Sequence, residues 1–249
     1  MSQTFLCPVC GGVAPAFDVV DFNKNCSELQ GHFLPLARQP IYYHMCDNCG
    51  HVFSPDFWQW SDNDFSEKIY NADYISIDPD YVEIRPLGNA QLLMQLFDSH
   101  KSTIKHLDYG GGNGKLSCLL KENGWNSISF DPFPNSPFEP DRLGKFNLIT
   151  AFEVFEHVPQ PQKLLANITQ LMDEACLVLF STLIADNSLK KNSRINWWYC
   201  SPRNGHISLF TRKSLSVLGK QHQLKFGSLN EGLHCYANRI PSFATQFAG

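Results

Sequence analysis

The sequence predicts an α/β fold with a mainly parallel sheet, and three observations carry this prediction. Strand-like and helix-like patterns alternate from residue 103 onward, which is typical of a parallel sheet covered by helices. A glycine-dense turn, 108–114, lies between the first of these strands and the first of these helices. Two Cys-x-x-Cys pairs precede this region and indicate a small, separate N-terminal segment.

Composition and charge limit the class of protein. A length of 249 residues, 43% of them hydrophobic, suits one full domain with a small addition. The formal net charge of -4 lacks the basic excess that nucleic-acid binding usually needs, and gives no reason to expect a membrane surface as a partner. The chain start has no signal-peptide pattern, and no apolar run approaches the about 18 residues of a membrane helix. We therefore expect a cytoplasmic protein; the sequence leaves its oligomeric state open.

Four of the nine cysteines form two Cys-x-x-Cys turns, here called knuckles, and a glycine follows each of them. The predicted metal ligands are Cys7, Cys10, Cys46 and Cys49. Two knuckles supply the four thiolates of a tetrahedral structural zinc site, with His44 and His51 as alternative ligands nearby. The competing interpretation is that the cysteines form a redox pair or are unpaired and buried. The odd number of cysteines argues against a disulfide framework. A site closed by four thiolates has no open position, so the expected zinc has no catalytic role.

The two knuckles are unusually far apart in the chain. Between Cys10 and Cys46 lie 35 residues, against about 15–20 in common zinc ribbons. The entropy cost of closing a loop grows slowly with its length, so this insertion is tolerable. We expect it to form an arm, 26–43, that leads into a strand at 41–45.

An aromatic-rich stretch joins the two parts. We expect a zinc-ribbon-like domain at 1–60, a helical bridge at 61–102 and the α/β domain at 103–249. Apolar spacing predicts a helix over 87–99 in the bridge. Tyr70, Tyr74 and Arg85 are expected to close over a ligand of the α/β domain, unless they only pack between the segments.

The elements of the α/β domain follow from local patterns. We expect strands at 104–108, 127–131, 146–153, 175–181, 224–229 and 232–240. Between them we expect helices at 114–123, 161–173 and near 211–222. Gly124 ends the first helix, and the helix at 161–173 carries its apolar residues on one face.

The glycine turn and a later carboxylate predict a nucleoside cofactor. Glycines let a ligand approach the main chain, and the helix start offers free N–H groups. Asp131 ends the second strand, where a carboxylate can accept hydrogen bonds from ribose hydroxyls. Asp108 ends the first strand; an acid there repels a pyrophosphate and suits the ammonium of an amino acid. The pattern therefore favours S-adenosylmethionine (SAM) over NAD. A plain tight turn at 108–114 and a turn aspartate at 131 are the simpler alternatives.

With these motifs, residues 104–240 resemble the class I SAM-dependent methyltransferases. The segment 153–159, Glu-Val-Phe-Glu-His-Val-Pro, resembles the region after the fourth strand of ubiquinone-biosynthesis O-methyltransferases. The segments 197–199 and 205–211 resemble the region before the last helix in the same broad group. N-terminal four-cysteine zinc segments also occur in sugar C-methyltransferases, which are longer and carry an additional C-terminal domain.

The resemblance implies a Rossmann-like sandwich whose seven-stranded sheet ends in an antiparallel strand. Only 13 residues, 133–145, separate the second strand from the one at 146–153, so we expect the third strand to be short or missing. The adenine would then lie against the loop 132–140, with Phe133 or Phe138 against the ring. The expected cofactor-binding residues are Asp108, Tyr109, Gly110, Gly112, Asn113, Gly114, Asp131, Pro132, Phe133, Phe152, Glu153, Tyr70, Tyr74 and Arg85.

Methyl transfer to a hydroxyl needs a base at the reacting centre. The catalytic candidates are His157, His206 and Glu156, of which histidine suits neutral pH best. A structural role for each histidine is the alternative. Residues 183–210, with three aromatics at 197–199, have a loop-like composition and are expected to form a lid or acceptor pocket.

The leading hypothesis is a methyltransferase that acts at oxygen on a small molecule or a sugar-containing metabolite. An rRNA base methyltransferase with a zinc ribbon is an alternative, which the acidic balance disfavours. A non-catalytic scaffold that keeps the fold is a third hypothesis.

Overall fold

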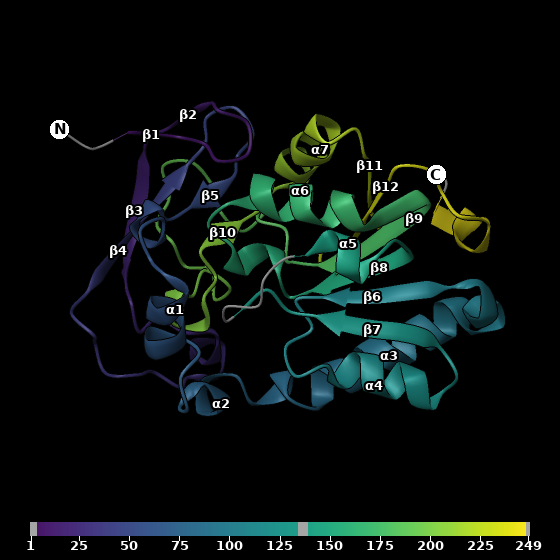
Figure 1. Cartoon of the computed structure of the whole chain (residues 1–249). Helices are drawn as coiled ribbons and strands as arrows, with labels where there is room; N and C mark the ends of the chain where they lie inside the picture. The colour runs from purple at the N-terminus through teal and green to yellow at the C-terminus, as the bar shows by residue number, and fades with distance from the viewer. Residues whose placement is uncertain (1–3, 134–138, 248–249) are drawn as a thin grey trace.

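The structure, a computed structural model, describes residues 4–133 and 139–247. A six-stranded sheet with helices on both faces forms the larger part, and small sheets from the N-terminal segment pack beside it (Figure 1). This arrangement confirms the predicted α/β fold. None of the helices in the described ranges is long and apolar enough to cross a membrane.

The large sheet has the order β11-β12-β9-β8-β6-β7. Its strands are β6 (Lys105–Tyr109), β7 (Asn126–Phe130), β8 (Phe146–Phe152), β9 (Met172–Ser181), β11 (Lys225–Ser228) and β12 (Leu233–Ala237). β7, β6, β8 and β9 pair in parallel, whereas β12 runs antiparallel to both β9 and β11. The predicted antiparallel last strand is therefore confirmed. Between β7 and β8, the described residues contain only the short helix α5 (Pro140–Leu143). In this part of the chain, β7 is an edge strand of the sheet.

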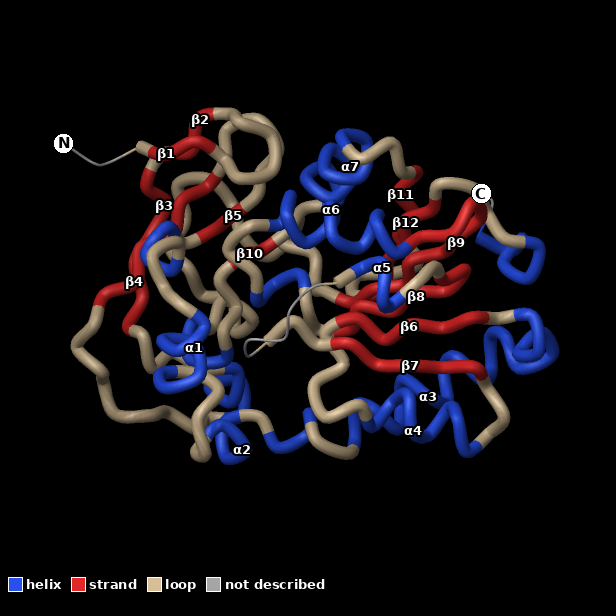
Figure 2. The backbone as a smooth tube through the Cα atoms, viewed as in Figure 1, coloured by secondary structure: helices blue, strands red, loops and turns tan. Residues whose placement is uncertain are grey.

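Helices cover both faces of this sheet because its strands are apolar on both sides (Figure 2). The helices are α3 (Ile84–Phe97) and α4 (Lys115–Glu122) on one face, and α6 (Pro161–Leu171) and α7 (Arg212–Gln221) on the other. In β9, Val178 and Phe180 pack toward α6 and α7, whereas Leu177 and Leu179 pack toward α3 and α4. This alternation is the two-residue period of a strand.

The N-terminal segment contributes two sheets. Its strands are β1 (Phe5–Leu6), β2 (Val13–Ala14), β3 (Ala16–Asp21), β4 (Pro40–Met45) and β5 (Val52–Phe53). The order of the second sheet is β10-β5-β4-β3, so it includes β10 (Ser208–Leu209) from the far end of the chain. The zinc-ribbon-like segment and the α/β part thus share a sheet. The predicted domain boundaries themselves stay a prediction.

Helices occur in residues 61–102, the predicted bridge. It contains α1 (Asp62–Lys68), α2 (Tyr74–Ile77) and α3. α3 begins at Ile84 and not at Leu87, because Pro86 falls in the first helical turn, where a proline needs no hydrogen-bonded N–H. Short 3₁₀ helices complete the structure: η1 (Cys26–Gln30), η2 (Pro55–Phe57), η3 (Pro79–Tyr81), η4 (Asp98–Thr103), η5 (Phe155–His157), η6 (Pro202–Asn204) and η7 (Ser242–Phe247).

Candidate functional site

The glycine turn between β6 and α4 depends on glycine at each step. Gly110, Gly112 and Gly114 have φ angles of 74°, 52° and 75°, which side chains disfavour. A Cβ at Gly111 would lie 2.2 Å from Oδ2 of Asp108 and 2.3 Å from Oγ of Ser129. The turn therefore has no room for a side chain at Gly111, and its glycines leave the main chain open to a ligand.

Asp131 follows β7 and closes this turn. One carboxylate oxygen accepts a hydrogen bond of 2.8 Å from the Gly112 N–H, and the other accepts one of 2.9 Å from the Phe133 N–H. Both bonds hold the carboxylate at the carboxyl end of the parallel strands, where ligands of open α/β sheets bind. Phe133 in turn makes an edge contact with the ring of Tyr70, at 5.4 Å between centroids. Phe138, the other predicted adenine contact, lies outside the described residues.

Asp108 lies under the turn and is almost completely buried. Thr150 stands opposite it in the β6–β8 register and donates a hydrogen bond of 2.8 Å to Oδ1. Burial raises the pKa of Asp108 to about 7, since removal from water disfavours the charged carboxylate. The ring of its neighbour Tyr109 is buried in the core, so only the main chain of Tyr109 can face a ligand.

The chain turns sharply after β8. Glu153 has a φ of 53°, which is uncommon for a residue with a side chain. Ser181, at the end of β9, accepts a hydrogen bond from the Glu153 N–H at 2.8 Å and donates one to its carboxylate at 2.7 Å. Phe152 is partly exposed at the same edge of the sheet. Glu153 is therefore held in place next to the glycine turn.

The three predicted catalytic residues come together. One ligand atom from each of Glu156, His157 and His206 lies within 4.8 Å of the others, a donor set that could also hold a divalent metal. Glu156 is fully buried, and burial raises its pKa to about 8. The Tyr199 hydroxyl donates a hydrogen bond to this carboxyl group. The Ile207 N–H donates to the Glu156 carbonyl at 2.9 Å, which ties η5 to the segment that carries His206.

Hydrogen bonds define which nitrogen of each histidine is free. Nδ1 of His206 lies 2.8 Å from the Tyr199 carbonyl, and Nδ1 of His157 lies 3.2 Å from the Gly205 carbonyl. A carbonyl only accepts, so we assign the proton to Nδ1 in both rings, which leaves both Nε2 lone pairs available. Burial lowers the pKa of His157 to about 4, so this ring is neutral at pH 7.

Residues of the bridge also contact His157 and the segment that leads to His206. The Tyr70 hydroxyl lies 3.1 Å from Nδ1 of His157, and the Tyr74 hydroxyl donates to the Asn204 carbonyl at 3.3 Å. Arg85 forms a two-pronged ion pair with Asp78. The guanidinium of Arg85 is therefore engaged within the bridge, and a cofactor carboxylate would have to share it with Asp78.

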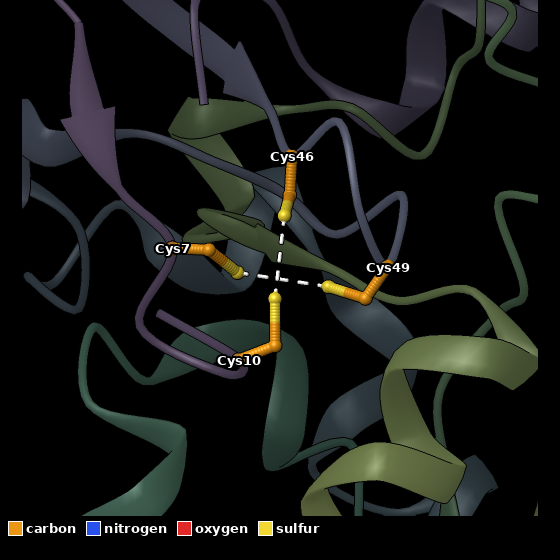
Figure 3. Close-up of side chains that lie close together, drawn as sticks. All are labelled: Cys7, Cys10, Cys46 and Cys49. Atoms are coloured by element: carbon orange, nitrogen blue, oxygen red, sulfur yellow. Dashed lines mark hydrogen bonds between the residues drawn. The ribbon is translucent and has the colours of Figure 1, made fainter. Parts of the chain in front are cut away.

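The four knuckle cysteines converge on one point (Figure 3). The Sγ atoms of Cys7 and Cys49 are 3.6 Å apart, and those of Cys10 and Cys46 are 3.4 Å apart. A tetrahedral zinc with Zn–S bonds of about 2.3 Å places its sulfurs about 3.8 Å apart, so this set fits zinc. These distances are far longer than the about 2.05 Å of a disulfide.

The two histidines considered as alternative ligands bond elsewhere. Nδ1 of His44 lies 3.2 Å from the Ala14 carbonyl, and Nδ1 of His51 lies 3.0 Å from the Leu209 carbonyl. Neither belongs to the set of ligand atoms that the four thiols form. The donor set is thus four sulfurs.

Three side chains at the site were not foreseen. Thr150, Ser181 and Asp78 hold predicted residues in place through the hydrogen bonds described above. Thr150 and Ser181 are polar residues within or at the end of otherwise apolar strands, which is a signal that sequence reasoning could have used. Asp78 carried no such signal.

Comparisons with known proteins agree with this arrangement. A family model described as "Methyltransferase domain" matches residues 81–228, more than half of the chain. No curated protein sequence matches the chain significantly.

Solved methyltransferase structures also match the chain, at low sequence identity and with TM-scores below 0.5. The plantazolicin methyltransferase BpumL in complex with SAH is 11% identical, with a TM-score of 0.49 over 69% of this chain and 91% of that one. The mitomycin 7-O-methyltransferase MmcR is 11% identical, with a TM-score of 0.48 over 72% and 60%. A SAM-dependent methyltransferase from Aquifex aeolicus is 12% identical, with a TM-score of 0.37 over 61% and 96%.

The family match spans the glycine turn, Asp131 and the Glu156–His157–His206 cluster. An enzyme is therefore favoured over a non-catalytic scaffold that keeps the fold. The chain belongs to the methyltransferase domain family.

Proposed function

We propose that this enzyme transfers the methyl group of SAM to a hydroxyl of a small-molecule or sugar-containing acceptor. The observation that carries the proposal is the pair of neutral histidines beside the glycine turn, of which His206 is buried and His157 is partly exposed. Their Nε2 lone pairs can accept the proton that a hydroxyl loses on methylation. The acidic net charge of the chain does not favour an rRNA acceptor.

The cofactor would lie across the carboxyl ends of β6, β7 and β8. Asp131 would accept hydrogen bonds from the ribose hydroxyls, and Phe133 and Pro132 would face the adenine. Asp108 and Glu153 would face the ammonium end, with the main chain of the turn between them. Tyr70, Tyr74 and Arg85 would cover the bound cofactor from the bridge. When bound, SAM supplies the activated methyl group, and the protein supplies orientation and exclusion of water.

Proton removal would take place in the cluster of Glu156, His157 and His206. The Gly205 and Tyr199 carbonyls orient the two rings, so that Nε2 of His157 or of His206 faces the acceptor. Glu156 lies beside them, and its raised pKa of about 8 keeps it mostly protonated at neutral pH, so it adds little charge to the pocket. Which of the two histidines takes the proton is a question for separate variants.

We also propose that zinc occupies the four-cysteine site and has a structural role. The support is the separation of the thiols, which suits tetrahedral coordination and leaves no position for a substrate. Cytoplasmic location remains a prediction.

The direct test is cofactor binding followed by a search for the acceptor. Calorimetry should detect SAM binding to the wild-type protein, weakened at least tenfold in Asp131→Ala, because about 1.4 kcal/mol of ribose hydrogen bonding is lost. Incubation with a metabolite extract and mass detection should then reveal a product heavier by one methylene. An Asp131→Ala protein that binds SAM like the wild type would contradict the cofactor placement.

The glycine turn provides a sharper test of the same placement. Gly111→Ala should abolish measurable SAM binding, because the new Cβ would overlap the Asp108 carboxylate and force the turn out of position. Gly124→Ala, at the far end of α4, is the control: the nearest atom to its Cβ is 4.0 Å away, and the cost is about 1–2 kcal/mol of backbone strain. Equal losses of affinity in the two variants would argue against a cofactor at this turn.

Affinity for SAM should depend on pH through Asp108. The pKa of Asp108 is about 7 in the free protein, and a neighbouring ammonium would stabilise the carboxylate and lower that pKa. Binding therefore favours the deprotonated form, so SAM affinity should rise as pH increases toward 7 and level off above it. Calorimetry from pH 5.5 to 8.5 should show a rise of up to about tenfold per pH unit below 7. Asp108→Asn should remove the slope; a slope that persists in this variant would assign it to another group.

A further inference from the structure

A cavity of about 820 Å³ lies outside the proposed cofactor site. One wall is the arm between the two zinc knuckles, and the other is the loop before β10. Residues of the two walls include Glu28 and Phe33 from the arm, Lys24 just before the arm, and Lys190, Arg194 and Trp198 from the loop. Its volume lies within the about 300–1,000 Å³ typical of small-molecule sites.

Both walls continue directly into the residues around His206. On the arm, the Cys26 N–H donates to Oδ1 of Asn204 at 2.9 Å, and Sγ of Cys26 lies 3.8 Å from Nδ1 of His206. On the loop, the ring of Trp198 contacts Tyr199, whose ring lies 4.1 Å from that of His206. One layer of buried side chains, which includes Tyr199, therefore separates the cavity from the cluster on the Nδ1 side of the His206 ring.

The polar groups of the cavity suit a sugar. The two tryptophans, Trp197 and Trp198, lie among the side-chain amides and hydroxyls of Asn187, Ser188, Ser193 and Asn196. The C–H face of a sugar packs against an aromatic ring, while its hydroxyls exchange hydrogen bonds with amides and hydroxyls.

The charges of the cavity favour a ligand with a negatively charged group. Lys24 is paired with Glu28 at 3.6 Å, and Arg194 is paired with Asp18 at 2.9 Å. Among the described residues, no ion pair includes Lys190. Lys190 therefore leaves one positive charge without an acidic partner, and a negatively charged ligand group would supply that partner.

We propose that this cavity is a second binding site beside the cluster, and that its ligand is a sugar with an anionic group. The proposal goes beyond the proposed function, because it assigns a ligand to a cavity outside the reaction site. It also gives the long insertion between the knuckles a role, since the arm forms one wall. A carboxylate and a phosphate offer Lys190 the same chemistry, so both are tested.

The test uses the zinc-loaded full-length protein with fluorine-labelled tryptophan, followed by NMR. Glucuronate, glucose 6-phosphate and glucose are added separately, and Trp198→Phe assigns the resonance. At least one acidic sugar should shift the Trp198 signal with an affinity about tenfold above that of glucose, the equivalent of about 1.4 kcal/mol. Whichever of the two acidic sugars binds more tightly identifies the anion.

Neighbouring lysines supply a matched pair of variants. Lys190→Ala should remove the preference for the acidic sugar, whereas Lys191→Ala should keep it, because Lys191 pairs with Asp47 at 2.7 Å outside the cavity. Both variants should bind SAM like the wild type. The proposal is overturned if no sugar shifts the signal, if glucose binds as well as the acidic sugars, or if both lysine variants behave alike. Sugar binding by a protein that fails to bind SAM would instead refute the proposed function and leave the sugar site standing.

Discussion

Replacing Cys46 with serine is expected to release the zinc and to lower kcat at least tenfold, while SAM still binds. Structural zinc stabilises small segments that bury too little core on their own. Here the knuckle also holds the segment that carries His206. The Thr211 hydroxyl donates to the Cys49 carbonyl at 2.6 Å, and β5 pairs with β10 directly after the knuckle. β10 begins two residues after His206, so a loosened knuckle displaces that histidine.

Metal analysis, thermal unfolding and kinetics together check this prediction. The wild type should hold about one zinc per chain and Cys46→Ser none, with an unfolding temperature lower by several degrees, as expected for a loss of about 2 kcal/mol or more in a protein of this size. Cys118→Ser is the control, because Cys118 is exposed and lies outside the knuckles. A zinc-free Cys46→Ser protein with full kcat would show that the knuckle does not position His206.

Local signals in the sequence predicted the elements that hold the site. The glycines of the 108–114 turn and the aspartate after β7 each follow from the chemistry of one short segment. The same holds for the four cysteines, since a knuckle is a local motif and two knuckles require only that their insertion can close. These predictions needed no knowledge of which distant segments pair.

Contacts between distant segments are what the sequence did not reveal. Pairing of β10 with β5 joins residues more than 150 positions apart, through strands of only two residues each. The bond from Thr150 to Asp108 depends on the register of two parallel strands, which no local pattern specifies. The polar residues that orient the catalytic cluster are visible in the sequence, but their partners are determined by the tertiary fold.

The second large effect is a fall in kcat, expected when either His157 or His206 is replaced. His157→Ala or His206→Ala should lower kcat by about 10²–10⁴-fold, the usual contribution of a positioned base, with SAM affinity within about twofold of the wild type. The variant with the larger loss identifies the base. His222→Ala is the control, because His222 lies between α7 and β11 and bonds to Gln162. Unchanged kcat in both site variants would exclude this cluster from proton removal.

A glycine substitution can show whether the position of the ring matters as well as its presence. A Cβ at Gly205 would lie 2.7 Å from the Tyr70 hydroxyl and 2.9 Å from Nδ1 of His157, so Gly205→Ala must displace one or both. Gly124→Ala has nearly the same backbone strain, with φ of 83° against 84°, but its nearest atom is 4.0 Å away. If orientation by the Gly205 carbonyl is part of catalysis, kcat should fall at least tenfold in Gly205→Ala only, although both variants lose similar backbone stability. Equal kcat in the two variants would mean that His157 acts without this positioning, and His206, held by the Tyr199 carbonyl, would then be the stronger candidate for the base.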